Sequence, residues 1–473
     1  MRLIVLGGFN IGMSDSKGIL VQIKEKENVS SSVLVSHVKR LDEKINYYDF
    51  FSQYQHYKGE RFFWKDPSSE NILVGIGVCE KIECVGSNNH YKHVQEKWNE
   101  LLNQAIIENE FENSGIGPIL LGGFSFDPQH EKSTLWNGFS DGYFFVPSMM
   151  LSEIEGNQYL TINCLIPRED IENAHYEIES KLHELSSNIV KSPFISENKR
   201  INFTELNGQQ WKQTVRNVIS RLDSELKKVV LAREAKVTFS NTIETEFVLK
   251  NLIQQQKNGY IFALESQNKC FLGATPERLV KKEGETVYSA CLAGSIPRGR
   301  DLEEDQRLEQ ELLHDSKNRI EHNYVVEMIR NAMELVCEKI IIPSEPQVLK
   351  MRDIQHLFTP VSGVVKKSES IFSIIKRLHP TPALGGFPQD KALKIIREEE
   401  NLDRGLYGSP LGWLDYKGNG EYAVSIRSGV INGKEANIFA GCGIVADSDV
   451  DLEFKETAIK FKPMLSALGG NTE

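Results

Sequence analysis

Lys228 and Glu277 are the two residues whose settings could support acid–base chemistry. Lys228 begins the apolar run KVVLAR. If that run forms a strand buried on both faces, the lysine loses hydration, and the neutral amine that can act as a base is favoured. Glu277 follows FLGATP, where Gly273 and Pro276 end an apolar strand, so a poorly solvated carboxyl there would keep its proton and act as an acid. A solvated strand-end lysine and a turn carboxylate that caps the next segment are the alternatives.

Three further acids could bind a hard metal ion. Glu321 lies in a long amphipathic stretch at 301–336, and Glu453 and Glu456 are three residues apart near the C-terminus, so a helix would place that pair on one face. Carboxylates that converge from two helices, with room for water, suit Mg²⁺ better than zinc. Because the chain has 66 Asp and Glu residues, solvated surface acids are the alternative.

Glycine-rich turns and two cations could bind an anionic ligand. The turns lie at 293–295, 380–386 and 440–444, and each could bring backbone N–H groups close to a ligand. Hairpin and helix-cap glycines are the alternative. Arg427 and Lys460 are candidate partners for a carboxylate, which arginine can bind through two parallel hydrogen bonds.

The elements that must position these residues differ between residues 1–200 and residues 201–473. The first region contains mainly strand-like runs, with one helix-patterned stretch at 90–109, and the second holds all the candidate chemistry. Strands and helices occur in blocks rather than in strict alternation, which favours an α+β fold over a doubly wound parallel sheet. The main elements expected in the second region are a helix at 209–226, strands at 228–233, 422–431 and 435–440, and the helix at 301–336.

Composition excludes several classes of function. The formal net charge of -11 argues against a nucleic-acid partner, because proteins that neutralise phosphates concentrate Lys and Arg on a basic face. Seven scattered cysteines, an odd number, are typical of reduced thiols in a cytosol. No run approaches the ~18 apolar residues of a membrane span. We therefore expect a cytoplasmic protein that binds neither nucleic acid nor membrane.

Taken in order, these motifs resemble the chorismate-utilising enzymes, a family that includes isochorismate, salicylate, anthranilate and aminodeoxychorismate synthases. The N-terminal half resembles the family's more variable portion through RFFWKDP (61–67) and GGFSFDP (122–128). The motifs that carry the resemblance in the second half are KVVLAR (228–233), FLGATPERL (271–279), LAGSIPRG (292–299), SKNRIEHNYVV (316–326), QHLFTPVSG (355–363), HPTPALGG (379–386), YGSPLGW (407–413), SIRSG (425–429), AGCGIVADSD (440–449) and EFKET (453–457).

The resemblance implies an α+β fold in which two large antiparallel β-sheets pack face to face, with helices outside and the site at the end of the sheets. Residues 1–200 are then a variable N-terminal half that contributes strands to the common body. Residues 201–473 are the chorismate-binding catalytic region.

Three positions separate the reactions within this family. Lys228 stands where the ammonia-using members have glutamine, which implies that water is the nucleophile and that no amidotransferase subunit is needed. Ala293 replaces the lysine that forms a covalent adduct in aminodeoxychorismate synthases. Ala383 stands where members that eliminate pyruvate tend to have threonine. The resemblance therefore implies a magnesium-dependent isochorismate synthase of the menaquinone branch, with a salicylate synthase, or an isochorismate synthase serving siderophore synthesis, as the alternatives.

The same resemblance implies a role for each site residue. Mg²⁺ anchors the ring carboxylate of chorismate, Lys228 deprotonates the water that attacks C2, and Glu277 protonates the departing C4 hydroxyl. The metal ligands are Glu321, Glu453 and Glu456. The substrate-binding residues are Arg427 and Lys460 for a carboxylate, Gly294, Gly441 and Gly443 for backbone contacts, His379 for shape, and Ser295, Ala383 and Leu384 in the adjoining turns.

Overall fold

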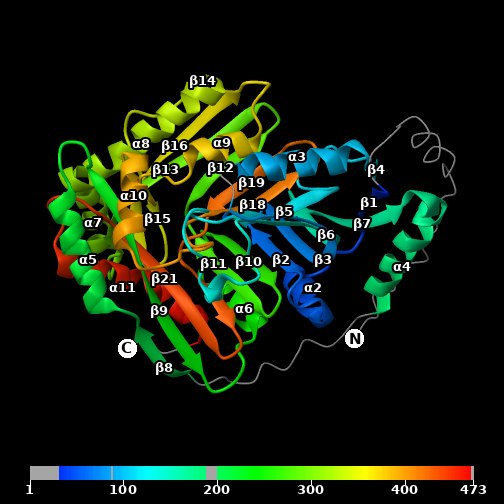
Figure 1. The fold of residues 1–473 in the computed structure, drawn as a ribbon, viewed down its shortest axis with the longest axis horizontal. Helices are drawn as coiled ribbons and strands as arrows, with labels where there is room; N and C mark the ends of the chain where they lie inside the picture. The colour runs from blue at the N-terminus through cyan, green and yellow to red at the C-terminus, as the bar shows by residue number, and fades with distance from the viewer. Residues whose placement is uncertain (1–30, 87–88, 188–199, 470–473) are drawn as a thin grey trace.

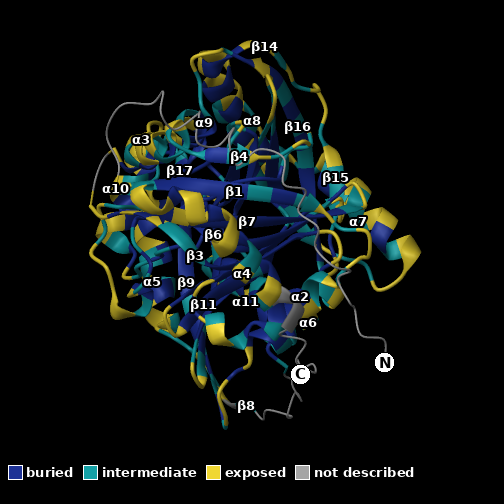
Figure 2. Cartoon of the chain, turned by 90° about the vertical axis from the view of Figure 1, so that its right-hand side faces the viewer, coloured by how far each residue is buried: buried dark blue, intermediate teal, exposed yellow. Residues whose placement is uncertain are grey.

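The apolar runs of the sequence form long strands in a computed structural model of the protein, which describes residues 31–86, 89–187 and 200–469. In β6 (Gly142–Ile154), all residues but one are buried. A strand that is buried on both faces must lie between two layers of other elements. The molecule is accordingly layered, with strands inside and helices outside (Figure 1), and exposed residues concentrate on the outer elements (Figure 2).

The first sheet gathers strands from both halves of the sequence. Its strands are antiparallel except for one short parallel pair at its edge. β8 (Arg200–Glu205) and β17 (Gly386–Phe387) both pair with the last strand of the series. The spatial order is β4 (Ile106–Glu108), β1 (Ser32–Arg40), β7 (Asn157–Pro167), β6, β3 (Asn71–Cys84), β2 (Arg61–Lys65), β10 (Tyr260–Ser266), β11 (Lys269–Thr275), β20 (Ser428–Asn432), β21 (Glu435–Ile444) and β9 (Lys228–Phe239).

The second sheet is joined to the first through β6. Residues 142–145 of β6 pair with the second sheet, whereas residues 149–154 pair with β7 of the first. β14 (Cys337–Ile341) and β15 (Gln347–Lys350) both pair with the strand at the far edge. The order from the junction is β5 (Ile119–Phe124), β18 (Pro410–Asp415), β19 (Gly420–Val424), β12 (Arg278–Glu283), β13 (Thr286–Pro297) and β16 (Ile354–Val365).

Alternate residues of each strand face different layers, as a period of two requires. In β2, Phe62 and Trp64 point into the core between the two sheets, where they join Trp413 of β18. Phe63, between them, points to the outer face of the first sheet and packs edge-on against Phe51. Each such fully buried aromatic side chain contributes about 1.5–3 kcal/mol through removal of apolar surface from water.

Helices cover the outer faces of both sheets. Those over the first sheet are α2 (Tyr47–Gln53), α4 (Ala174–Ser187), α6 (Thr245–Gln255) and α11 (Val450–Ala467). Those over the second sheet are α7 (Leu302–His314), α8 (Ser316–Val336) and α9 (Ile371–Leu378). α3 (His90–Asn103) packs on β3 and β6 and against α9, while α5 (Gly208–Arg221) and α10 (Gln389–Glu399) pack on β9.

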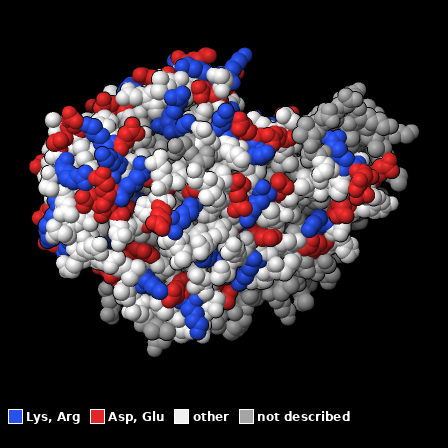
Figure 3. All heavy atoms as spheres, in the orientation of Figure 1, with Lys and Arg blue, Asp and Glu red and all other residues white. Residues whose placement is uncertain are grey.

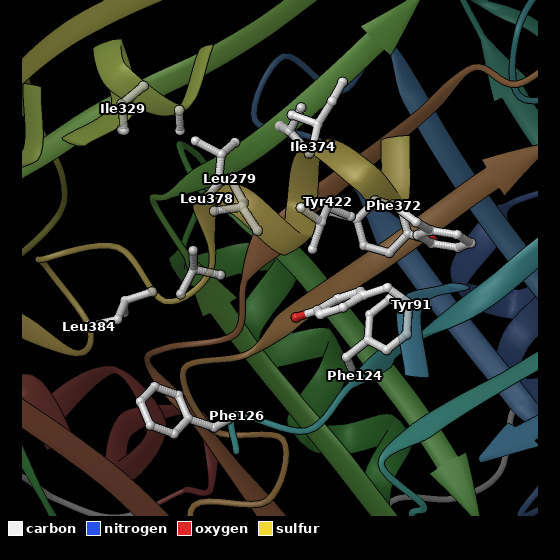
Figure 4. Packing of buried hydrophobic residues seen from close by; sticks show 14 of the residues in the cluster. Tyr91, Phe124, Phe126, Leu279, Ile329, Phe372, Ile374, Leu378, Leu384 and Tyr422 are labelled. Atoms are coloured by element: carbon white, nitrogen blue, oxygen red, sulfur yellow. The ribbon is translucent and has the colours of Figure 1, made fainter. Parts of the chain in front are cut away.

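An aromatic cluster fixes α9 and α3 to the second sheet. Phe124 of β5 contacts Tyr91 of α3 at 4.3 Å and Phe372 of α9 at 5.3 Å between ring centroids. Tyr422 of β19 completes the cluster, and Figure 4 shows these four rings together. The predicted α+β fold of two antiparallel sheets with helices outside is thus confirmed.

Two expected elements are interrupted. The expected helix at 301–336 is two helices, because Asp315 is extended and its side chain accepts a hydrogen bond from the Asn318 N–H, which starts α8. The expected strand at 422–431 is likewise β19 and β20, separated at Arg427, whose φ of 54° lies in the left-handed region. Both breaks place residues at the candidate site.

Strands from the first 200 residues pair directly with later strands. β2 pairs with β10, and β5 pairs with β18. The division of the chain near residue 200 stays a prediction, since residues 188–199 lie outside the described residues. Within the described part of the chain, no helix is long and apolar enough to cross a membrane. Basic and acidic side chains are interspersed over the face seen in Figure 3.

Candidate active site

A cavity of about 200 Å³ lies where β9 and β21 of the first sheet approach β13 and β16 of the second. The first turns of α8 and α11 border it. Its polar lining comes entirely from the second half of the sequence. Of the residues expected at the site, those that line the cavity are Lys228, Glu277, Gly294, Ser295, Glu321, Ala383, Leu384, Arg427, Gly441, Gly443, Glu453, Glu456 and Lys460.

Lys228 is the first residue of β9 and is 3% exposed. Its Nζ lies 3.3 Å from Oε2 of Glu321, which projects from α8 on the opposite side of the cavity. Gly443 on the neighbouring strand β21 makes room for it, because a Cβ at that position would lie 2.4 Å from Lys228 Cε. The amine is therefore buried in a narrow space between β9, β21 and α8.

Glu277 lies in the turn between β11 and β12 and is 4% exposed. Its backbone is fixed by hydrogen bonds from its N–H to Thr275 Oγ1 and from the Val424 N–H to its carbonyl. Its carboxyl forms no hydrogen bond with another described residue. Burial raises the pKa of Glu277 to about 8, against the opposing charges of Arg427, Lys228 and Lys460. The carboxyl is accordingly protonated at neutral pH and can donate a proton.

The three carboxylates expected to bind metal lie in the same cavity, each beside a lysine. Glu321 contacts Lys228 at 3.3 Å, Glu453 lies 3.6 Å from Lys317, and Glu456 contacts Lys460 at 2.6 Å. In the described part of the chain, no three acidic, histidine or cysteine side chains are gathered closely enough to hold a metal ion. The donor set, which consists of carboxylate oxygens only, fits Mg²⁺ in type.

The two acids of α11 influence each other. Burial raises the pKa of Glu453, and the nearby negative charge of Glu456 raises it further. Burial also acts upward on the pKa of Glu456, but Lys460 and then Arg427 hold it below its ordinary value. Two neighbouring carboxylates of like charge, one of them buried, are a setting that a divalent cation would stabilise.

Arg427 offers a positive charge that the protein itself does not use. It is 8% exposed, and its guanidinium forms no hydrogen bond with another described residue. Burial lowers the pKa of this guanidinium. Its left-handed backbone, uncommon for a residue with a side chain, is often found at functional sites, where strain is tolerated for position. A carboxylate in the cavity would supply the missing partner.

His379, which the family resemblance places at the site, does not line the cavity. Its ring packs edge-on against Phe126, and Nε2 lies 3.3 Å from the carbonyl oxygen of the same residue. Burial lowers the pKa of His379 to about 3, so the ring is neutral. His379 lies behind the turn that carries Ala383 and Leu384 and supports that turn.

Several lining residues were not among those expected from the sequence. His356 of β16 is 5% exposed, and its Nδ1 lies 2.7 Å from Ser295 Oγ. Tyr407 and Lys317 also line the cavity. All three lie inside or beside motifs of the resemblance, so the signal was present in the sequence, but nothing in it showed which side chains point inward.

One lining arginine is fully used by the protein. Arg404 forms two hydrogen bonds with Glu400, at 2.6 and 2.7 Å, and donates to the carbonyl oxygens of Leu384 and Val230. Glu400 also accepts a hydrogen bond from the Ala232 N–H. This arrangement ties the turn at Leu384 to β9, so Arg404, unlike Arg427, has its donors used within the protein.

Known proteins share this fold and sequence. A family model described as chorismate binding enzyme matches residues 20–469. Isochorismate synthase MenF from Bacillus subtilis is 42% identical over 462 residues, which cover 96% of this chain and 97% of that protein. The salicylate biosynthesis isochorismate synthase from Pseudomonas aeruginosa is 35% identical over 87% of this chain and 86% of its own. The structure of MenF, the menaquinone-specific isochorismate synthase from Escherichia coli, has the same fold, with a TM-score of 0.78, 22% identity and coverage of 96% and 98%.

Proposed function

Because the chain belongs to the family of chorismate-binding enzymes, we propose that it is an isochorismate synthase, an isomerase that adds water at C2 of chorismate and releases the C4 hydroxyl. The observation that carries the proposal is that a protonated carboxyl, Glu277, shares one cavity with a buried amine, Lys228. An allylic substitution of one hydroxyl for another needs an acid and a base at the same time. Two relatives that match most of this chain are both named as isochorismate synthases.

Glu277 acts as the general acid. With its pKa at about 8, it holds a proton at neutral pH and gives it to the C4 hydroxyl, which departs as water while the double bonds shift. The absence of any hydrogen bond from its carboxyl to a described residue leaves this proton available. The turn between β11 and β12 fixes the backbone of Glu277 and leaves its carboxyl without a hydrogen-bond partner among the described residues.

Lys228 acts as the general base. Its buried position at the start of β9 keeps bulk water away, and its position against Gly443 aims the amine along the cavity. It removes a proton from the water that attacks C2. The mass of the substrate is unchanged, because one water enters and one leaves.

Mg²⁺ is proposed as the cofactor, held by Glu321, Glu453 and Glu456. When bound, it would supply a Lewis acid that attracts the ring carboxylate of chorismate. Arg427 binds the second carboxylate, on the enolpyruvyl arm, through its unused donors, and Lys460 adds a positive charge nearby. Gly294 and Gly441 allow the backbone to approach the ligand closely, as at the positive φ of 80° of Gly294.

We assign the product to menaquinone synthesis rather than to a siderophore. The assignment is supported by the 42% identity, over nearly both whole chains, to a protein that bears the same name, MenF, as the menaquinone-specific enzyme with this fold. Direct elimination of pyruvate, as in a salicylate synthase, is disfavoured because Ala383 places a methyl group, and no hydroxyl, on the cavity wall.

The proposed setting is the cytoplasm, with chorismate as the partner and without an amidotransferase subunit, a nucleic acid or a membrane. The seven cysteines support a reducing compartment, since all are free thiols and six are buried. Lys228 supports water rather than ammonia as the nucleophile.

The test is to incubate the purified protein with chorismate and Mg²⁺, with and without EDTA, and to identify products by chromatography and mass spectrometry. We expect isochorismate of unchanged mass, no pyruvate, and loss of turnover in EDTA. Salicylate with pyruvate would contradict the role given to Ala383. A requirement for ammonia would contradict the role given to Lys228. Full turnover in EDTA would show that the reaction does not need a metal ion.

A further inference from the structure

Each of the three carboxylates proposed to bind Mg²⁺ has a lysine partner, and one of these partners is unlike the other two. Lys228 and Lys460 have side chains that are only 3% and 12% exposed, whereas the side chain of Lys317 is 48% exposed. Lys460 is also held by a second bond, to the carbonyl oxygen of Gly441 at 2.9 Å. Lys317 thus lies beside the acids without being enclosed by the protein.

We propose that Lys317 is a tethered cation that competes with Mg²⁺ for Glu453 and so sets how tightly the site binds the metal. The inference rests on the magnesium site of the proposed function. Lys317 Nζ lies 3.6 Å from Glu453 Oε1, close enough for ionic attraction but beyond a hydrogen bond. The same oxygen accepts a hydrogen bond from Ser448 Oγ at 2.7 Å. A divalent cation that takes this oxygen as a ligand must share it with that hydroxyl, and it must also share it with the ammonium or displace the ammonium.

The position of Lys317 in α8 makes it suited to this role. The next residue, Asn318, fixes the backbone of this turn, because its side chain accepts a hydrogen bond from the Ser295 N–H and donates one to Asp315. The lysine is therefore anchored at the rim of the cavity, one helical turn before Glu321. Its long side chain can leave Glu453 for solvent, since nearly half of it is already exposed.

The sign of the effect follows from electrostatics. Removal of the ammonium removes both a competitor for the carboxylate and a positive charge that repels a dication a few ångströms away. Because Lys317 is half-exposed, solvent and salt screen part of this repulsion. We expect Lys317→Met to tighten Mg²⁺ binding roughly tenfold at low ionic strength, and the difference to shrink as NaCl is added.

The experiment is calorimetric titration of MgCl₂ into the full-length protein without chorismate, so that the readout is metal affinity rather than turnover. Lys317→Arg keeps the charge and should bind Mg²⁺ like the wild type. Lys455→Met is the matched control, because Lys455 is an exposed lysine on α11 between the two acids and does not line the cavity. It should change the affinity little. Circular dichroism checks that each variant is folded.

The outcomes separate this inference from the proposed function. Tighter Mg²⁺ binding by Lys317→Met, and by neither other variant, supports the proposal that Lys317 competes with the metal. Wild-type binding with an unchanged or weakened affinity in Lys317→Met overturns it and leaves the magnesium site intact. A folded wild-type protein that binds no Mg²⁺ overturns it together with the magnesium part of the proposed function.

Discussion

Two buried clusters of charge in this molecule differ in how fully the protein satisfies them. The first, the Arg61 cluster, consists of Arg61, Glu246 and Glu265 and joins β2, α6 and β10. The Arg61 guanidinium donates to both acids at 2.7–2.8 Å and to the carbonyl oxygen of Phe51 at 3.0 Å. The Gly59 N–H donates to Glu265 as well. Each nitrogen of the Arg61 guanidinium therefore has a partner within the protein, and none is left for a ligand.

The second cluster lines the cavity and is incompletely satisfied. The Glu277 carboxyl and the Arg427 guanidinium form no hydrogen bond with any described residue, although both are nearly as buried as Arg61. The pKa values differ accordingly. Burial lowers the pKa of Arg427, whereas the lowering by burial at Arg61 is outweighed by hydrogen bonds and charge from Glu265 and Glu246, which raise its pKa.

Burial of charge alone does not mark a functional site. A buried charge with every donor paired stabilises one arrangement of the chain, but removal of a partner is costly. A buried charge that lacks partners costs stability and persists where a ligand will supply them. The Arg61 cluster therefore stabilises the fold, whereas Glu277 and Arg427 are positions that we propose for the chemistry.

The largest expected effect is on the Arg61 cluster. Arg61→Met leaves Glu246 and Glu265 buried without their partner and should lower the free energy of unfolding by about 3–5 kcal/mol. Turnover per folded molecule should stay within about threefold of the wild type. Urea unfolding and active-site titration at low temperature measure the two quantities. A loss of turnover in Arg61→Met at unchanged stability would contradict the assignment of the Arg61 cluster to the fold.

Glu277→Gln should make the protein more stable at neutral pH. The unfolded chain has the ordinary pKa of 4.5 and the folded chain about 8, so folding holds a proton that the unfolded chain releases between these values. The free energy of unfolding of the wild type therefore falls by about 1.4 kcal/mol per pH unit over this window, and glutamine has no such loss. The variant should gain on the order of 3 kcal/mol at pH 7, and the gain should vanish near pH 4.5. Equal stabilities at all pH values, measured by urea unfolding, would mean that Glu277 is ionised.

Removal of the base or the acid should reduce turnover with little loss of structure. Lys228→Gln and Glu277→Gln should each lower kcat on the order of 10²-fold or more, as loss of general acid–base catalysis does. Isochorismate formation is followed by chromatography. Lys236→Gln is the matched control for the lysine, because Lys236 lies on the same strand but pairs with Glu435 at the surface. Wild-type turnover in Lys228→Gln would show that Lys228 is not the base of the reaction.

The smallest effect tests the space around the base. A Cβ at Gly443 would lie 3.0 Å from Lys228 Nζ, whereas the nearest atoms to one at Gly441 would be Leu231 O at 3.1 Å and Tyr407 Oη at 3.4 Å. Gly443→Ala should displace the amine and lower kcat roughly tenfold, since an ångström of misplacement is costly in catalysis. Gly441→Ala, two residues away on β21, should lower kcat less. A larger loss in Gly441→Ala would place the critical contact elsewhere.

The sequence was informative about the local settings of the candidate residues, because residue types and motifs are local. Lys228 at a strand start and Glu277 at a turn have those settings in the structure. Prediction failed at two kinds of position, one decided by a local side-chain cap and the other by a distant contact. Asp315 interrupts the expected long helix by capping α8, and His379 is held behind the cavity wall by Phe126, a residue some 250 positions away.

By itself the sequence determined the family, the α+β class and the set of ionisable groups, since these depend on residue types and their order. Only the tertiary structure decided which of those groups lack partners. Glu277 keeps its proton because strands from both sheets bury it, and Arg427 faces the cavity because the chain turns through a left-handed conformation there. Protonation and pairing depend on the distances to neighbouring charges and on exclusion of water, and both are set by segments that are remote in the chain.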